Sequence, residues 1–121
     1  MTLTLLFSAP DRTWPAYETV LPQALKTAGI DADLTRSAGP DAVDYILYAP
    51  NDMLTDFTPY TRTKAVLSLW AGVEKIAPNP TLTQPLCRMV DPGLAEGMRD
   101  YVVGHVMRYH LGMDRHIHGL N

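Results

Sequence analysis

The sequence predicts an α/β protein with an open sheet of five parallel strands, and three observations lead to this prediction. Five short, mostly apolar runs are each followed by glycine, proline or a polar turn, which is typical of strands in a parallel sheet. Stretches whose apolar residues recur at helical spacing follow several of these runs. Hydrophobic residues make up 46% of the 121 residues and charged residues 19%, which indicates one globular domain with a core.

The first half of the chain is predicted to hold three strands and one helix. The strands cover residues 3–9, 30–35 and 43–49. A helix begins near Trp14-Pro15, because proline is tolerated in a first turn, and Gly29 ends it. Pro22 lies inside this helix and either bends it or moves its true start to a later residue.

The second half is predicted to hold the last two strands, at residues 65–70 and 86–90, and two helices. A short helix runs from Val73 to about Ala77. A long helix begins at the cap Asp91-Pro92 and runs to about His116. Five strands alternating with helices favour a flavodoxin-like sheet in the order 2-1-3-4-5.

The stretch 64–76 contains the most informative turn of the sequence. Gly72 follows the apolar run 65–70, at the point where a strand passes into the next helix. The N–H groups of residues 71–74 should point out from the carboxyl end of that strand, where ligands bind in open α/β sheets. Free N–H groups there favour an anion. An ordinary strand-to-helix turn is the alternative interpretation.

Several classes of function are disfavoured by what the sequence lacks. It contains neither Gly-x-Gly-x-x-Gly nor a phosphate-binding loop with a lysine, so it has no familiar nucleotide site. The net charge of −3, without a basic block, argues against nucleic acid or an acidic membrane as partner. Cys87 is the only cysteine, so no internal disulfide forms, and we expect it to be a small core residue of a cytoplasmic protein.

No metal site is predicted. The four histidines, which are His105, His110, His116 and His118, include no pair four residues apart, the spacing that a helical zinc site requires. A free-standing flavodoxin-like binding module or a phospho-acceptor receiver module is the alternative for this length and fold. Asp11 and Asp52 fall near two of the acidic positions of a receiver. Its acidic partner beside Asp11 and its lysine after the fifth strand are missing, so a divalent cation would be poorly held.

Three segments resemble the D-isomer-specific 2-hydroxyacid dehydrogenase family. Residues 70–76, Trp-Ala-Gly-Val-Glu-Lys-Ile, are similar to its Gly-Ala-Gly-Val-Asp stretch. Residues 85–91 and 97–103 continue the similarity. Together they look most like the glyoxylate/hydroxypyruvate reductase branch, and the resemblance is best from about Ile46 to His118.

The resemblance implies a two-domain enzyme that reduces 2-keto acids with NADH or NADPH, with a flavodoxin-like substrate domain. It implies that the backbone N–H groups of Ala71, Gly72 and Val73 hold the substrate carboxylate. It also implies that Tyr48, in a segment similar to the loop that covers the substrate, contacts the substrate.

The resemblance also implies that the family's catalytic arginine, glutamate and histidine, and its NAD or NADP site, lie beyond this chain. We therefore expect the chain to be an amino-terminal fragment that binds no cofactor and is inactive alone. Residues 1–92 would form the substrate-binding domain, and residues 93–121 an interdomain or dimerisation helix with a tail.

The long helix, from about Leu94 to His116, is expected to make a homodimer. It carries an apolar strip formed by Val103, Met107, His110 and Leu111, which has no obvious partner within the chain. The resemblance points the same way, because family members commonly pair through the corresponding helix. The alternative is that this strip packs on the nucleotide domain.

Overall fold

The computed structural model describes residues 2–119 and divides into two compact units. The first unit ends at Met89 and the second begins at Val90. Residue 1 of the predicted first domain and residues 120–121 of the predicted tail lie outside the described residues. None of the helices in the described part of the chain has the length and apolar character needed to span a lipid bilayer.

The first unit is built on one parallel sheet of five strands in the order β2-β1-β3-β4-β5, so the predicted fold class and strand order are confirmed. The strands are β1 (Leu3–Ser8), β2 (Ala32–Thr35), β3 (Tyr45–Tyr48), β4 (Ala65–Ser68) and β5 (Leu86–Cys87). Leu6 pairs with Ile46 and Ile46 pairs with Val66, and all three side chains are buried. The strand order reverses between β1 and β3, which is where open α/β sheets bind ligands.

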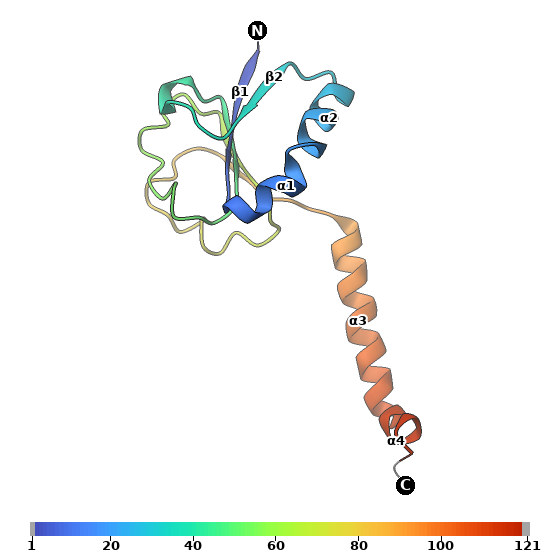
Figure 1. The fold of residues 1–121 in the computed structure, drawn as a ribbon. Helices are drawn as coiled ribbons and strands as arrows, with labels where there is room; N and C mark the ends of the chain where they lie inside the picture. Colours follow the sequence, from blue (N-terminus) through green and yellow to red (C-terminus); the bar gives the residue numbers. More distant parts are fainter. Residues whose placement is uncertain (1, 120–121) are drawn as a thin grey trace. The chain divides into compact units, whose positions relative to one another are not determined.

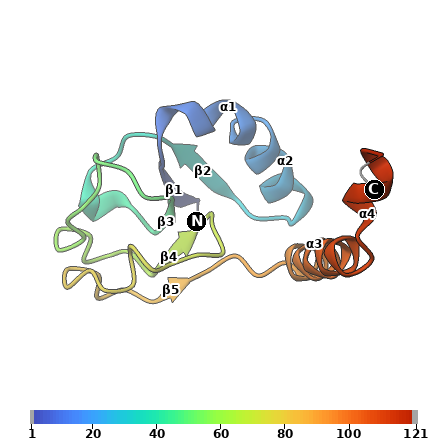
Figure 2. The same cartoon turned by 90° about the horizontal axis from the view of Figure 1, so that it is seen from below.

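One face of the sheet is covered by the helices α1 (Trp14–Tyr17) and α2 (Val20–Thr27), as Figures 1 and 2 show. Phe7 of β1 is buried there, and its ring lies 5.0 Å from that of Trp14 and 5.5 Å from that of Tyr17. Buried Ala9, Leu47 and Ala49 complete this cluster from the sheet side. The two helices therefore pack against β1 and β3 near the edge of the sheet where both strands end.

The other face is covered by the loops that follow β3 and β4, without a regular helix. Leu54, Phe57 and Ile76 from these loops are buried against the sheet. Side chains tie the loops together: Asn79 donates to the carbonyl of Thr55 at 2.8 Å, and the hydroxyl of Thr81 accepts the N–H of Phe57 at 2.9 Å. Hydrogen bonds between side chains and backbone thus hold this layer together, in place of the backbone hydrogen bonds of a helix.

The helix predicted after residue 14 forms as two pieces. A 3₁₀ turn, Asp11–Thr13, precedes α1, and α2 begins only at Val20, which places Pro22 in its first turn. The missing N–H of Pro22 is then harmless, because first-turn N–H groups have no intrahelical acceptor. Gly29 ends α2 with a φ of 67°, as predicted.

Two predictions for the segment that runs from β4 to β5 are wrong. The helix expected from Val73 to Ala77 is a single turn, in which the N–H groups of Ile76 and Ala77 share the carbonyl of Val73, and Pro78 prevents its extension. Cys87, expected in the core, is exposed because β5 is an edge strand of two residues.

The second unit consists of α3 (Pro92–His110) and α4 (Met113–Ile117). The predicted cap is confirmed, since the Asp91 carboxylate accepts the N–H of Gly93 at 2.9 Å and Pro92 opens the helix. The prediction of one helix to His116 is wrong, because Gly112 adopts a φ of 62° and separates α3 from α4. No residue of α3 is buried.

A buried carboxylate joins three strands at the edge of the sheet where they begin. Asp44 accepts the N–H of Thr4 at 3.0 Å, and its other oxygen lies 3.3 Å from both Arg62 Nη2 and Lys64 Nζ. The hydrogen bond from Thr4 lowers the pKa of Asp44 below its ordinary value of 3.8, and the two cations assist against the opposing effect of burial.

We expect Asp44→Asn to destabilise the first unit at neutral pH and to make its stability less sensitive to acid. Because the folded pKa of Asp44 is lowered, its charged form contributes stability above pH 3.8 that is lost as the pH falls through the folded value. Urea unfolding at pH 7 and near pH 3 should therefore show a difference between wild type and variant that shrinks in acid. Asp33→Asn, at an exposed position of β2, is the control and should leave both values unchanged. A constant difference across this range would contradict the prediction.

Candidate functional site

The ends of β1, β3 and β4 place three loops side by side at one edge of the sheet. Backbone pairing continues past the strands, since Ala49 donates to the carbonyl of Ser8 at 3.1 Å and Leu69 donates to that of Tyr48 at 2.8 Å. The loops that begin at residues 9, 49 and 69 therefore start from a fixed frame. This edge is the candidate site.

The turn after β4 presents a row of backbone N–H groups. The hydroxyl of Ser68 donates to the carbonyl of Trp70 at 2.8 Å and accepts the N–H of Trp70 at 3.2 Å, which fixes the start of the turn. The next four N–H groups, of residues 71–74, donate to no acceptor within residues 2–119. Successive unpaired N–H groups of this kind can bind an anion.

Gly72 is exposed and does not adopt the left-handed backbone seen at Gly29 and Gly112. A positive φ is therefore not what favours glycine at this position. A Cβ atom at Gly72 would lie 2.8 Å from Oε2 of Glu74, so the Glu74 carboxylate lies over the bare backbone of Gly72. The missing side chain leaves room there for a carboxylate.

A small cavity of about 140 Å³ adjoins this turn. Gly72 and Val73 line it, together with Pro50, Trp70, Glu74, Lys75 and Ile76. Ala71 does not line this cavity, although its N–H belongs to the same unpaired row. The volume suits a molecule of a few heavy atoms.

A larger, open cavity of about 550 Å³ lies over the ends of β1 and β3, at the point where the strand order reverses. Its lining mixes polar and apolar surface and consists of Pro10, Asp11, Tyr48, Pro50, Asn51, Asp52, Met53, Thr55, Lys75 and Asn79. Pro50 and Lys75 line both cavities, so the two are neighbours. Lys75 forms no ion pair with any residue of the described range 2–119.

Asn51 holds the two strand ends together beneath the larger cavity. Its side-chain N–H₂ lies within hydrogen-bonding distance of the carbonyl of Ser8 (3.0 Å), the hydroxyl of Ser8 (3.2 Å) and the carbonyl of Ala49 (2.8 Å). Its side-chain oxygen accepts the N–H groups of Met53 at 2.9 Å and Leu54 at 3.0 Å. All of its polar atoms are engaged, so Asn51 positions this edge and is not free for a ligand.

Tyr48, the predicted substrate contact, lies at the end of β3 and lines the larger cavity but not the small one. It is buried, its hydroxyl donates to the carbonyl of Leu54 at 3.4 Å, and its ring packs edge-on against Phe57 at 5.4 Å. Burial raises the pKa of Tyr48, so its hydroxyl stays protonated at neutral pH. Tyr48 and residues 71–73 thus belong to adjoining parts of the edge.

The structure gives little support to the alternative of a receiver module. Asp11 and Asp52 do line the same cavity, but Asp11 forms an ion pair with Arg36. Within residues 2–119, no three His, Cys, Asp or Glu side chains come close enough together to hold a metal ion.

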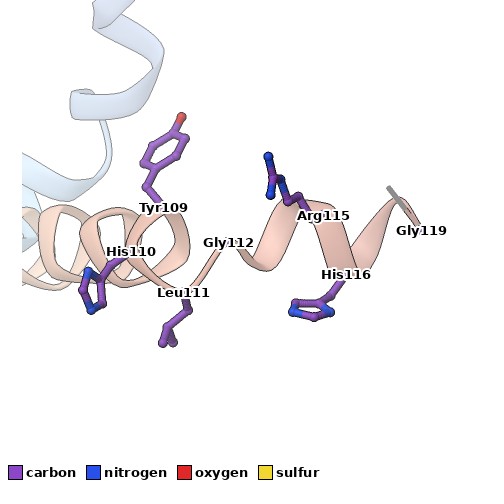
Figure 3. A pocket seen from close by; sticks show the side chains of 7 residues that line it. All are labelled: Tyr109, His110, Leu111, Gly112, Arg115, His116 and Gly119. Carbon is purple, nitrogen blue, oxygen red and sulfur yellow. The ribbon is translucent and has the colours of Figure 1, made fainter. Parts of the chain in front are cut away.

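The second unit has a hollow at the junction of α3 and α4, which includes His110, Arg115 and His116 (Figure 3). The labelled side chains do not converge on a common point: Tyr109 and Arg115 point to one side, and His110, Leu111 and His116 point to the other. His105 lies between two aromatic rings of α3, 4.4 Å from that of Tyr101 and 6.5 Å from that of Tyr109. These side chains form no convergent site.

Three residues of the edge carried no distinct signal in the sequence. Lys75 and Asn51 acquire their roles from the way two long loops fold over the sheet, and Ser68 acquires its role from the turn that it stabilises. The Ala-Gly-Val step could be identified beforehand because its sequence pattern is short and local, and Tyr48 could be identified from the resemblance of its segment.

No protein-family model matches the chain, and no curated protein matches it. Among solved structures, it is similar to a D-isomer-specific 2-hydroxyacid dehydrogenase from Xanthobacter autotrophicus Py2, determined in complex with NADPH and MES. The TM-score is 0.65 at 24% sequence identity. The match covers 90% of this chain and 36% of the dehydrogenase chain, so this chain shares a fold with about a third of that enzyme.

Proposed function

We propose that this chain is the substrate-binding portion of an NAD(P)H-dependent 2-keto acid reductase of the D-2-hydroxyacid dehydrogenase type. The observation that carries the proposal is the row of unpaired N–H groups at residues 71–74, at the position where the resemblance places substrate carboxylate binding. The fold shared with a dehydrogenase of this kind supports it.

The proposed substrate is a small 2-keto acid such as glyoxylate or hydroxypyruvate. The 140 Å³ cavity beside Gly72 is of suitable size, and Lys75 supplies a cation at the border of the two cavities. Tyr48 would contact the substrate from the larger cavity.

Hydride transfer needs a bound nicotinamide and a proton donor. We assign both to a nucleotide domain outside these 121 residues, which would bind NADP or NAD. The proposal therefore assigns no turnover and no cofactor binding to this chain by itself. It places the parent enzyme in the cytoplasm, as a homodimer formed through α3, with neither nucleic acid nor membrane as partner.

The first test is an NMR titration of the chain with glyoxylate. We expect weak binding, with shifts concentrated in the amide signals of residues 71–75, because the main-chain N–H groups would donate to the ligand carboxylate. Methyl glyoxylate, which lacks the charge, should leave these signals in place. Shifts confined to a distant surface would count against the proposal.

Gly72→Val should abolish the shifts, since the new side chain would displace the Glu74 carboxylate and cover the N–H groups. Gly97→Val is the matched control, because a Cβ atom at Gly97 meets no atom within 4 Å. A Gly72→Val protein that folds and binds glyoxylate as the wild type does would overturn the assignment.

A further inference from the structure

Glu74 places a negative charge at the anion site itself. Its Oε2 lies 2.8 Å from where a Cβ atom of Gly72 would be, and its side chain lines the small cavity. The carboxylate forms neither an ion pair nor a hydrogen bond with any partner among residues 2–119. Its charge is therefore not neutralised by a direct contact.

Lys75 provides the opposite charge, but from a different direction. Glu74 lines the small cavity only, whereas Lys75 lines both the small and the large one. A ligand carboxylate on the N–H groups of residues 71–74 would thus have a like charge over Gly72 and an opposite charge towards the large cavity. One ligand charge is balanced by Lys75, whereas a second adds repulsion from Glu74 without a second cation to offset it.

We propose that Glu74 is a specificity-determining residue that makes this edge select small monoanionic 2-keto acids and reject dianionic ones. The inference rests on the proposed function, because it concerns the same anion site. It goes further because it assigns the choice among 2-keto acids to the charge of one side chain.

Glyoxylate and oxomalonate form a matched pair of ligands for the test. Both carry a carbonyl next to a carboxylate, and oxomalonate has a second carboxylate where glyoxylate has hydrogen. The dissociation constants of both would be measured by NMR titration for wild type, Glu74→Gln and Glu74→Asp. Glutamine keeps the size of the side chain and removes the charge, whereas aspartate keeps the charge on a shorter chain.

We expect wild type to bind glyoxylate more tightly than oxomalonate. Glu74→Gln should tighten glyoxylate binding about two- to fivefold, the size of one exposed charge interaction, and should tighten oxomalonate binding by a larger factor. Glu74→Asp should retain the preference for glyoxylate. Raising the salt concentration should shrink the difference between wild type and Glu74→Gln, because exposed charges are screened.

Equal gains for the two ligands in Glu74→Gln would overturn the inference, since removing a charge that selects between them should favour the ligand with two negative charges over the ligand with one. Unchanged binding of both ligands would overturn it as well, and would leave the proposed function intact if glyoxylate still shifts residues 71–75. If neither wild type nor variant shows such shifts, the inference and the proposed function both fail.

Discussion

Asn51→Asp is expected to destabilise the first unit by about 2–3 kcal/mol at neutral pH, because it places a carboxylate oxygen against acceptors. The side-chain N–H₂ of Asn51 lies 2.8–3.2 Å from two carbonyl oxygens and the hydroxyl of Ser8. A carboxylate keeps the oxygen that accepts from Met53 and Leu54 but loses both donors. Two strand ends then lose their shared partner, and their carbonyl groups meet a negative charge.

Urea unfolding at pH 7, followed by circular dichroism, measures this loss. Acid should restore part of it, because a protonated carboxyl group at this position can donate one hydrogen bond to the carbonyl of Ser8 or Ala49. This pH dependence has the opposite sign to that of Asp44, whose contribution to stability disappears in acid.

Asn79→Asp is the matched control for Asn51→Asp. Its side-chain N–H₂ makes one hydrogen bond, to the carbonyl of Thr55, whereas its oxygen accepts from Thr81 and would be retained. We expect a loss of about 1 kcal/mol there. Equal losses for the two variants would show that Asn51 has no special role in joining β1 to β3.

The elements that could be predicted from the sequence are those fixed by local chemistry. β1 is a mostly apolar run ended by a proline, and its predicted bounds differ from the observed ones by one residue. Asp91-Pro92 starts α3 because a carboxylate cap followed by proline satisfies the first turn. Gly29 ends α2 because a left-handed residue is needed there.

The wrongly predicted helices depend on a balance of competing interactions that the spacing of apolar residues does not reveal. Val73 and Ile76 have helical spacing, but a helix of five residues gains too few hydrogen bonds to form unless tertiary contacts favour it, and here Ile76 is buried by a single turn. Apolar residues continue on both sides of Gly112, so periodicity favoured one long helix, whereas the glycine supports a left-handed break.

The part of the candidate site that consists of backbone was the most predictable from local sequence. Unpaired N–H groups at residues 71–74 follow from a glycine after a strand end, which is visible in the sequence. Glu74 and Lys75 stand next to each other in the chain, yet only the fold places one carboxylate over Gly72 and brings Lys75 to the border of two cavities. Long-range loop packing decides such positions, and no local rule predicts it.

The second large effect is expected in the association of α3. Val103, Met107 and Leu111 lie on one face of the helix end, at intervals of four residues, and all three are exposed. The same face carries Glu96 and Asp100 nearer to the start of α3. On this face of the helix the apolar residues are therefore confined to residues 103–111, about 12 Å along the helix at 1.5 Å per residue. Other faces of α3 also expose large apolar side chains, namely Leu94, Met98, Tyr101, Val102, Val106 and Tyr109.

A short apolar strip on an exposed helix favours a two-fold contact, in which the strip of one protomer covers that of its partner. Packing of the strip on a nucleotide domain is the competing interpretation. The two interpretations differ in solution, because a two-fold contact closes on itself and gives a discrete dimer, whereas an unsatisfied patch gives indefinite association. Sedimentation of the chain over a concentration series should show a monomer–dimer equilibrium.

Met107→Asp combined with Leu111→Asp should raise the dimer dissociation constant by at least about a hundredfold, since symmetry buries each new charge twice. Helical circular dichroism should be largely retained, with a small loss because acidic residues near a helix C-terminus are unfavourable. Met107→Lys with Leu111→Lys removes that complication and should dissociate the dimer equally.

Ala95→Asp with Gly97→Asp adds two negative charges to α3 outside the strip, and this control should remain dimeric. A wild-type chain that sediments as a monomer at the highest concentration would exclude the dimer, and dissociation of the control would assign the effect to net charge instead of the strip.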